Sequence, residues 1–127
     1  MPHRGLSAAE WELMDSIWRA GGQVTVRQVV DTTYPQRQKA YTTVQTIMNI
    51  LVDKGYLARN KPGRINYYEP IVTREEALQG SLSGMARLMF QGSVGAMASF
   101  LVGTTKLKPK ELDQLRQLLD QQDQGEQ

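Results

Sequence analysis

A short run in the middle of the chain places four polar, uncharged side chains on one face of a predicted helix. They are Thr42, Gln45, Thr46 and Asn49. Gln and Asn side chains can bind adenine bidentately, and threonine offers a hydroxyl together with a methyl that can meet the methyl of thymine. Carboxylates in these positions would be repelled by phosphates. The face therefore has the side chains that a helix needs to contact base edges in the major groove of DNA.

Basic residues are concentrated around this face. Residues 35–66 contain six lysines and arginines against a single acidic residue, whereas the whole chain has a net charge of only +2. Four of the basic residues are candidates for phosphate contacts: Arg37, Lys39, Lys54 and Arg64. Such contacts provide affinity and register but little specificity. The alternative is a solvated Thr- and Asn-rich surface beside a basic loop region.

Two helices are expected before this face. The first begins at a capping box formed by Ser7 and Glu10, in which each side chain bonds the free backbone N–H of the other residue. The second begins at a similar box of Thr25 and Gln28 and ends before Pro35. Both carry apolar residues at helical spacing, so both can pack on a common core.

The polar face belongs to a third helix, followed by a hairpin. The helix runs from Lys39 to Gly55, a residue that suits a left-handed C-cap. Short β-prone runs at 56–59 and 65–69 then flank a Pro-Gly turn with basic residues at its tip. Three helices and a basic hairpin in this order predict a mainly α winged helix-turn-helix, with the hairpin as the wing.

The character of the chain changes after residue 72. Three amphipathic helices are expected, the first opened by a capping box of Thr73 and Glu76. Their apolar residues with helical spacing include Leu78, Leu82, Met85, Met89, Met97, Leu101, Leu112, Leu115 and Leu119. These stripes can be buried by folding back on the winged helix or by pairing with a second copy. We expect the pairing, because isologous dimers are the commonest soluble oligomers. We expect a winged-helix domain over residues 1–72 and a helical dimerisation region over residues 73–127.

The residue inventory argues against several other classes of protein. The chain has no cysteine, one histidine, His3, and no glycine-rich phosphate loop with a lysine, so we expect no enzyme, metal or cofactor site. The absence of cysteine and of a visible signal peptide favours the cytoplasm. Arg87 and Gln91 interrupt the most apolar region, residues 82–102, so no membrane insertion is expected.

Three stretches together resemble a known family. They are LSAAEWELMDSIW, TTVQTIMNILVDKGYL and GRINYYEPIVTREE. The chain resembles, from about Leu6 to Leu119, the penicillinase repressor family, which includes methicillin-resistance and copper-responsive repressors. This resemblance implies an N-terminal winged helix, a C-terminal helical dimerisation region, and repression of operons by homodimers bound to dyad operators in double-stranded DNA.

Individual positions of the family pattern are retained only in part. The matching residues are Thr43, Thr46, Lys54, Gly55 and Tyr68. Family members often have arginine where this chain has Ile50, and serine or threonine where it has Ala40. We therefore expect DNA contacts from Lys39, Thr42, Thr43, Gln45, Thr46, Asn49, Lys54 and Arg64, but at an operator whose sequence the resemblance does not define.

The resemblance also suggests how repression could end. In β-lactam-responsive members a membrane sensor protease system triggers cleavage at an Asn-Phe bond in the dimerisation region. The nearest match here is Ser99-Phe100. Copper-responsive members use C-terminal cysteine ligands, which this chain lacks. The alternative to an operator-binding repressor is a winged helix that docks on another protein without sequence-specific DNA binding.

Overall fold

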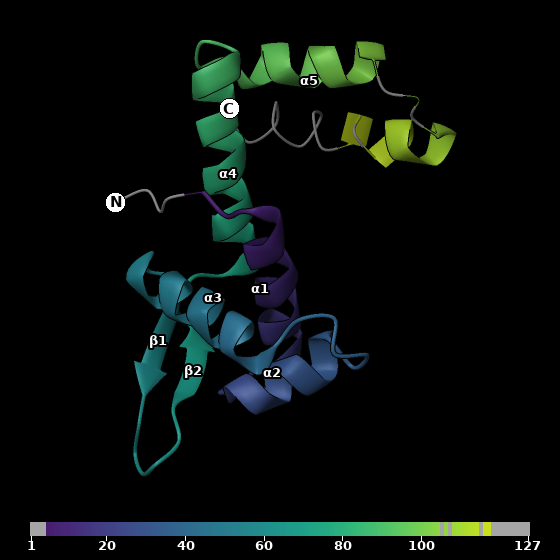
Figure 1. Ribbon diagram of the computed structural model, residues 1–127. Coiled ribbons are helices and arrows are strands. Elements are labelled where there is room, and N and C mark those ends of the chain that lie inside the picture. Colours follow the sequence, from purple (N-terminus) through teal and green to yellow (C-terminus); the bar gives the residue numbers. More distant parts are fainter. Residues whose placement is uncertain (1–4, 105, 107, 115, 118–127) are drawn as a thin grey trace. The chain divides into compact units, whose positions relative to one another are not determined.

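The computed structural model describes residues 5–104, 106, 108–114 and 116–117. Its elements are α1 (Ala8–Ala20), α2 (Val26–Thr33), α3 (Tyr41–Asp53), β1 (Leu57–Asn60), β2 (Tyr67–Pro70), α4 (Arg74–Met89) and α5 (Val94–Thr104), shown in Figure 1. Residues 109–114 and 116–117 are also helical. The chain divides into two compact units, Met1–Met85 and Ala86–Gln127.

Both predicted capping boxes at the start of the chain are present. The Ser7 hydroxyl accepts a bond from the Glu10 amide at 3.2 Å, and a Glu10 carboxylate oxygen accepts one from the Ser7 amide at 2.7 Å. Thr25 and Gln28 form the same reciprocal pair at the start of α2. These bonds satisfy N–H groups that a helix start leaves without partners, and they define where α1 and α2 begin.

Helix α3 is capped mainly at its C-terminal end. Its N-cap, Ala40, has an extended backbone and makes no side-chain capping bond. At the other end Lys54 is the C-cap, and Gly55 follows it with a φ of 88°. Glycine adopts a left-handed conformation of this kind at little cost, so α3 ends as predicted with a left-handed glycine, one position after the C-cap.

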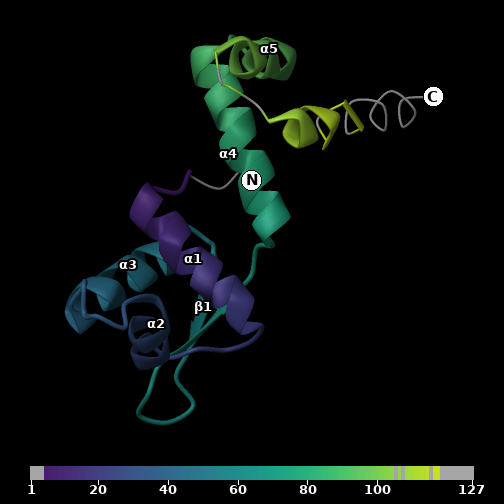
Figure 2. The same ribbon diagram turned by 90° about the vertical axis from the view of Figure 1, so that its right-hand side faces the viewer.

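The wing consists of β1, β2 and the loop 61–66 between them. The strands pair antiparallel, with Leu57 opposite Pro70 and Asn60 opposite Tyr67. Val24, just before α2, adds a bridge to Tyr68 with backbone bonds of 2.8 Å in both directions. The tip of the wing projects away from the three helices in both views of the molecule (Figures 1 and 2).

One apolar core holds α1, α2, α3 and the wing together. Its largest fully buried side chains are Leu13, Met14, Ile17, Val44, Met48, Leu51, Tyr56, Leu57 and Tyr68. Each buried side chain of this size contributes about 1.5–3 kcal/mol relative to exposure. Every element of the winged helix supplies part of this set or of the buried valines around it, so the core fixes the angle at which α3 is presented.

The start of α4 packs with the winged helix. Val72 and Ala77 are buried in the same core cluster, and the Trp18 indole donates a hydrogen bond to the Val72 carbonyl at 2.9 Å. Arg74 pairs with Asp15 at 3.1 Å. The compact unit therefore extends to Met85, although the change in sequence character that predicted a boundary comes after residue 72.

The second unit contains the end of α4 and all of α5. Gln91 and Gly92 have positive φ values of 54° and 85° and separate the two helices. Among the described residues, no single helix is long and apolar enough to cross a membrane; α4 and α5 meet the length and composition requirement only as a pair, bent by 88°.

Candidate nucleic-acid interface

The polar face predicted from the sequence lies on the outer side of α3. Its two threonines, Thr42 and Thr46, are exposed, and so is Thr43, which the family resemblance added to the predicted DNA contacts. The Thr46 hydroxyl donates to the Thr42 carbonyl at 2.9 Å. That bond uses the hydroxyl hydrogen but leaves the oxygen lone pairs and the methyl group free to meet a base edge.

A groove of about 580 Å³ lies between the start of α2, the first half of α3 and the wing. We call it the wing groove. Its lining residues are Thr25, Val26, Arg27, Tyr41, Gln45, Lys61, Arg64, Ile65 and Asn66. It contains three basic side chains and no acidic one, and it brings together Gln45 and Arg64, which lie far apart in the sequence. A polar base-contacting side chain and phosphate-binding cations therefore line one concave surface.

The wing groove also contains residues that the sequence did not single out. Arg27 and Tyr41 are both exposed, and the Arg27 guanidinium lies 4.8 Å from the centre of the Tyr41 ring. The attraction between the guanidinium and the ring holds the Arg27 charge in a defined orientation. Lys61 had a sequence signal, the basic hairpin tip, whereas nothing in the sequence around Arg27 indicated that α2 would present it beside the wing.

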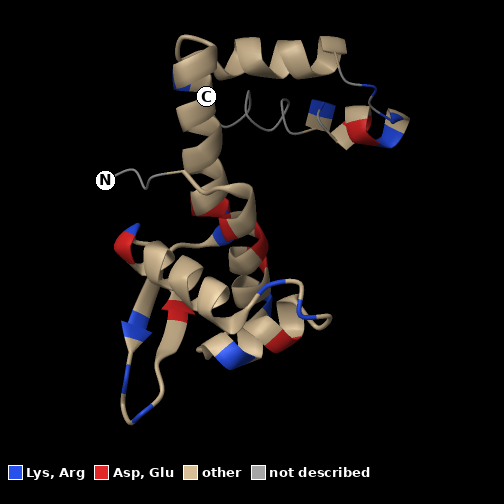
Figure 3. Ribbon diagram, in the orientation of Figure 1, with Lys and Arg blue, Asp and Glu red and all other residues tan. Residues whose placement is uncertain are grey.

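Charge is unevenly distributed over the winged helix. Figure 3 shows Lys and Arg on the wing, on α2 and in the loop that follows α2. Acidic residues gather on α1 and at the start of α4, and others lie on α2, at the end of α3 and on β2: Asp31, Asp53 and Glu69. The surface that contains the outer face of α3 is therefore the surface that a polyanion would approach.

The side chain of Asn49 is engaged in hydrogen bonds within the protein. Its side-chain oxygen accepts a hydrogen bond from Arg59 Nη1 and another from the Tyr68 hydroxyl, each at 2.8 Å. The sequence predicted a base contact here, on the assumption that the side chain is free. The structure instead places Asn49 at the junction between α3 and the wing.

Lys54 is also engaged away from the outer face of α3. Its ammonium lies 2.7 Å from a Glu10 carboxylate oxygen and donates a second bond to the Gly5 carbonyl at 3.1 Å, and both side chains of the ion pair are largely buried. Burial raises the pKa of Glu10, but hydrogen bonds from Lys54 and Ser7 and the charge of Lys54 bring it below its ordinary value. This geometry argues against the phosphate contact predicted for Lys54.

Lys39 has an intramolecular neighbour as well. Its ammonium lies 5.4 Å from the centre of the Tyr34 ring, and Tyr34 in turn donates a hydrogen bond to Glu12. Lys39 is half-buried, whereas Arg37 in the same loop is exposed, with a φ of 57°. The loop before α3 thus offers one free and one partly engaged cation.

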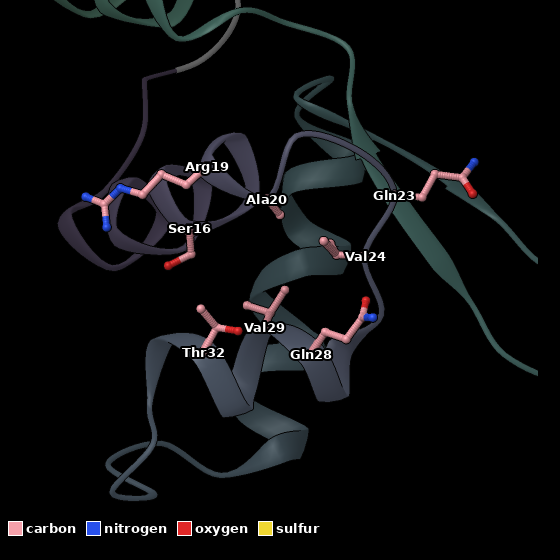
Figure 4. Close-up of a pocket in the computed structure, with 8 residues that line it drawn as sticks. All are labelled: Ser16, Arg19, Ala20, Gln23, Val24, Gln28, Val29 and Thr32. Atoms are coloured by element: carbon pink, nitrogen blue, oxygen red, sulfur yellow. The ribbon is translucent and has the colours of Figure 1, made fainter.

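A second hollow, of about 440 Å³, lies where α1 meets α2 and contains none of the predicted site residues. Figure 4 shows its lining: Ser16, Arg19, Ala20, Gln23, Val24, Gln28, Val29 and Thr32. Arg19 and Gln23 extend outward in opposite directions, and Gln28 already accepts the Thr25 capping bond. The hollow therefore has no convergent polar groups of the kind that orient a ligand.

Most of the predicted dimerisation residues on α4 and α5 are exposed. Their exposed fractions are 39% for Leu78, 40% for Leu82, 43% for Met85, 69% for Met89 and 50% for Leu101. Met97 differs, because it is buried. Leu112 is half-buried, and Leu115 and Leu119 lie outside the described residues.

No group of three or more His, Cys, Asp and Glu side chains that could hold a metal occurs in the described part of the chain. His3 lies outside that part.

Comparisons with known proteins agree with the geometry. An uncharacterised 16.5 kDa protein of Latilactobacillus sakei is 31% identical over 114 residues, which cover 90% of this chain and 77% of the relative. The transcriptional regulator BlaI of Mycobacterium tuberculosis is 29% identical over 121 residues, 94% of this chain and 86% of the relative. The methicillin resistance regulatory protein MecI of Mammaliicoccus sciuri is 24% identical and covers 91% of this chain and 93% of the relative.

A solved structure of the DNA-binding domain of the repressor BlaI is similar to the winged helix. Its TM-score is 0.50 at 28% identity, over 56% of this chain and 85% of that one. The sequence profile described as penicillinase repressor matches residues 6–121, nearly the whole chain. On this match, the chain belongs to the penicillinase repressor family.

Proposed function

We propose that this chain, a DNA-binding transcriptional repressor by its family, binds a dyad operator as a homodimer through α3 and the wing. The observation that carries the proposal is the wing groove, where Gln45 on α3 lies beside Arg27, Lys61 and Arg64. Gln45 and the threonines of α3 would contact base edges, while the cations would bind the phosphates on either side. An operator-binding protein of this kind acts in the cytoplasm, with the chromosome.

The dimer is supported by the apolar surface of α4 and α5. Large apolar side chains stay exposed along both helices: Leu78, Leu82, Met85, Leu88, Met89, Val94, Phe100, Leu101 and Val102. Leu88 is 85% exposed, and apolar surface of this kind marks an interaction site. A second copy would cover it, and two linked winged helices bind a dyad with affinity raised by a factor of about 10²–10⁴.

Release of the operator would follow from loss of the dimer. The Ser99-Phe100 bond lies inside α5, where both residues are exposed and the Phe100 ring is 5.9 Å from that of Phe90. Proteases prefer exposed loops, so cleavage at this bond requires α5 to open locally first. A membrane sensor protease system is the partner that the family resemblance implies for this step.

Selection of DNA by the full chain tests the proposal. The chain is incubated with a random-sequence duplex library, and the enriched sequences are then titrated at several salt concentrations. We expect an inverted repeat, bound with a steep loss of affinity as salt rises, because each phosphate contact contributes about 0.9 to the logarithmic slope. If no sequence is enriched and salt has no effect, the fold serves protein docking instead.

A further inference from the structure

We infer that Asn49 is a positioning residue that fixes the wing against the recognition helix α3, and that it does not contact a base of the operator. This inference rests on the proposed operator binding through α3 and the wing. It gives a specific structural function to a side chain whose type and place on α3 predict direct recognition of adenine.

The hydrogen bonds at Asn49 leave its amide oxygen no capacity for a base. A carbonyl oxygen has two lone pairs, and here it accepts from Arg59 Nη1 and from the Tyr68 hydroxyl, each at 2.8 Å. Bidentate binding of adenine needs the amide oxygen as an acceptor for N6 and the amide nitrogen as a donor to N7. Adenine could therefore be bound in this way only if both internal bonds were broken.

The two donors come from opposite strands of the wing at the same position. Arg59 on β1 is directly paired with Tyr68 on β2. Asn49 thus bonds both strands at one rung of the hairpin, and only the pair Asn60–Tyr67 lies between that rung and the loop 61–66. The contact holds the last ordered part of the wing, where a small rotation would move the tip furthest.

Tyr68 is anchored independently of Asn49. Its side chain is completely buried, and its backbone is bonded to Val24 in both directions. Burial raises the pKa of its phenol more than Arg59 lowers it, so the hydroxyl stays protonated and remains a donor. The Asn49 oxygen is therefore held by a rigid partner from the core and a longer, exposed one from β1.

The contact links the two parts of the proposed interface. Gln45 lies one helical turn before Asn49 on α3, and Lys61 and Arg64 lie in the loop just beyond the bonded rung. When Asn49 holds the Arg59–Tyr68 pair in place, α3 can contact bases and the wing loop can contact phosphates at the same time. Without this contact, we expect α3 to bind in the major groove while the wing no longer reaches its phosphates.

The decisive comparison is between Asn49→Ala and Tyr68→Phe in the full chain, with the inverted repeat selected by the wild-type protein as the probe. Tyr68→Phe removes one donor from a buried position that cannot contact DNA. We expect each variant to weaken operator binding by about three- to tenfold, and the double variant by little more than either one. The salt slope of each should become shallower by about 0.9 for every phosphate that the wing no longer binds.

A second readout separates positioning from base contact. Affinities are measured for a set of operators, each with one base pair changed. If Asn49 is a positioning residue, Asn49→Ala weakens binding to all of them by the same factor. Loss of discrimination at one base pair, or additive effects of Asn49→Ala and Tyr68→Phe, would overturn the inference.

Controls keep the outcomes distinct. Tyr67→Phe removes the hydroxyl of the neighbouring half-buried tyrosine on β2 and should leave affinity and salt slope unchanged. Thermal unfolding of each variant shows whether it is folded, and Tyr68→Phe keeps the ring that fills the core. If the wild-type chain itself shows no salt-dependent operator preference, the proposed function fails, whatever the variants do.

Discussion

Lys54 at the end of α3 forms a largely buried ion pair with Glu10 in the first turn of α1, with 2.7 Å between ammonium and carboxylate. The same carboxylate closes the capping box with Ser7. A single acidic side chain thus defines the start of α1 and anchors the end of α3.

Lys54→Ala should therefore reduce stability without removing a DNA contact. It leaves the buried Glu10 carboxylate without its cation, at a cost of about 2–3 kcal/mol, below the range for fully buried pairs because the Lys54 side chain keeps 17% exposure. Urea unfolding measures this loss. Lys61→Ala is the matched control. It should leave stability unchanged and make the salt dependence of DNA binding shallower.

The pH dependence of stability should reflect Glu10. The pKa of Glu10 is lower in the folded chain than its ordinary value of 4.5. The ionised carboxylate therefore contributes its full stabilisation at pH values above 4.5, and this stabilisation is lost as the pH falls through the lowered pKa. Glu10→Gln keeps an acceptor for the Ser7 amide but has no charge. The stability difference between wild type and Glu10→Gln should shrink between about pH 7 and about pH 3 in urea unfolding. A constant difference would contradict the assignment.

Gln45 should determine sequence preference. Gln45→Ala should reduce discrimination between the selected operator and random DNA by about 1–3 kcal/mol, the value of one bidentate base contact. Arg64→Ala should weaken binding to both kinds of DNA similarly, because a phosphate contact carries no sequence information. Competition titrations give the ratio directly, and an unchanged ratio for Gln45→Ala would remove it from the base-contacting set.

Arg27 should behave as a phosphate-binding residue although it lies on α2. Arg27→Ala should lower the salt slope of operator binding by about 0.9. Tyr41→Leu should weaken binding less, because it removes the aromatic surface that orients the guanidinium but leaves the charge. Arg19→Ala provides a control, since that arginine lies outside the wing groove. Equal slopes for wild type and Arg27→Ala would exclude the contact.

Removal of the chain after Ser99 should convert the repressor into a monomer. The deletion takes away Phe100, Leu101 and Val102 and everything beyond, while the core of the winged helix stays intact. Sedimentation should show a monomer at micromolar concentration, with operator affinity reduced by about 10²–10⁴ and weak half-site binding retained. A truncated chain that remains dimeric and binds the operator fully would rule out release by cleavage at this bond.

Local sequence signals were sufficient for the winged helix. Capping boxes at Ser7 and Thr25 and the glycine after α3 act over three or four residues, so their geometry is contained in the sequence itself. Helical periodicity likewise separated the buried side of α3 from its polar side. The family resemblance then attached a function to that fold.

Which polar residues of α3 are free was decided only by tertiary contacts. Asn49 and Gln45 are both amides on one side of the same helix, yet Asn49 is bonded to Arg59 and Tyr68 while Gln45 lines the wing groove. Lys54 is occupied by a carboxylate that lies 44 residues away in the sequence. A side chain's type and helical position show what it can bind, but a partner brought close by folding satisfies its hydrogen bonds first, and no local pattern encodes that partner.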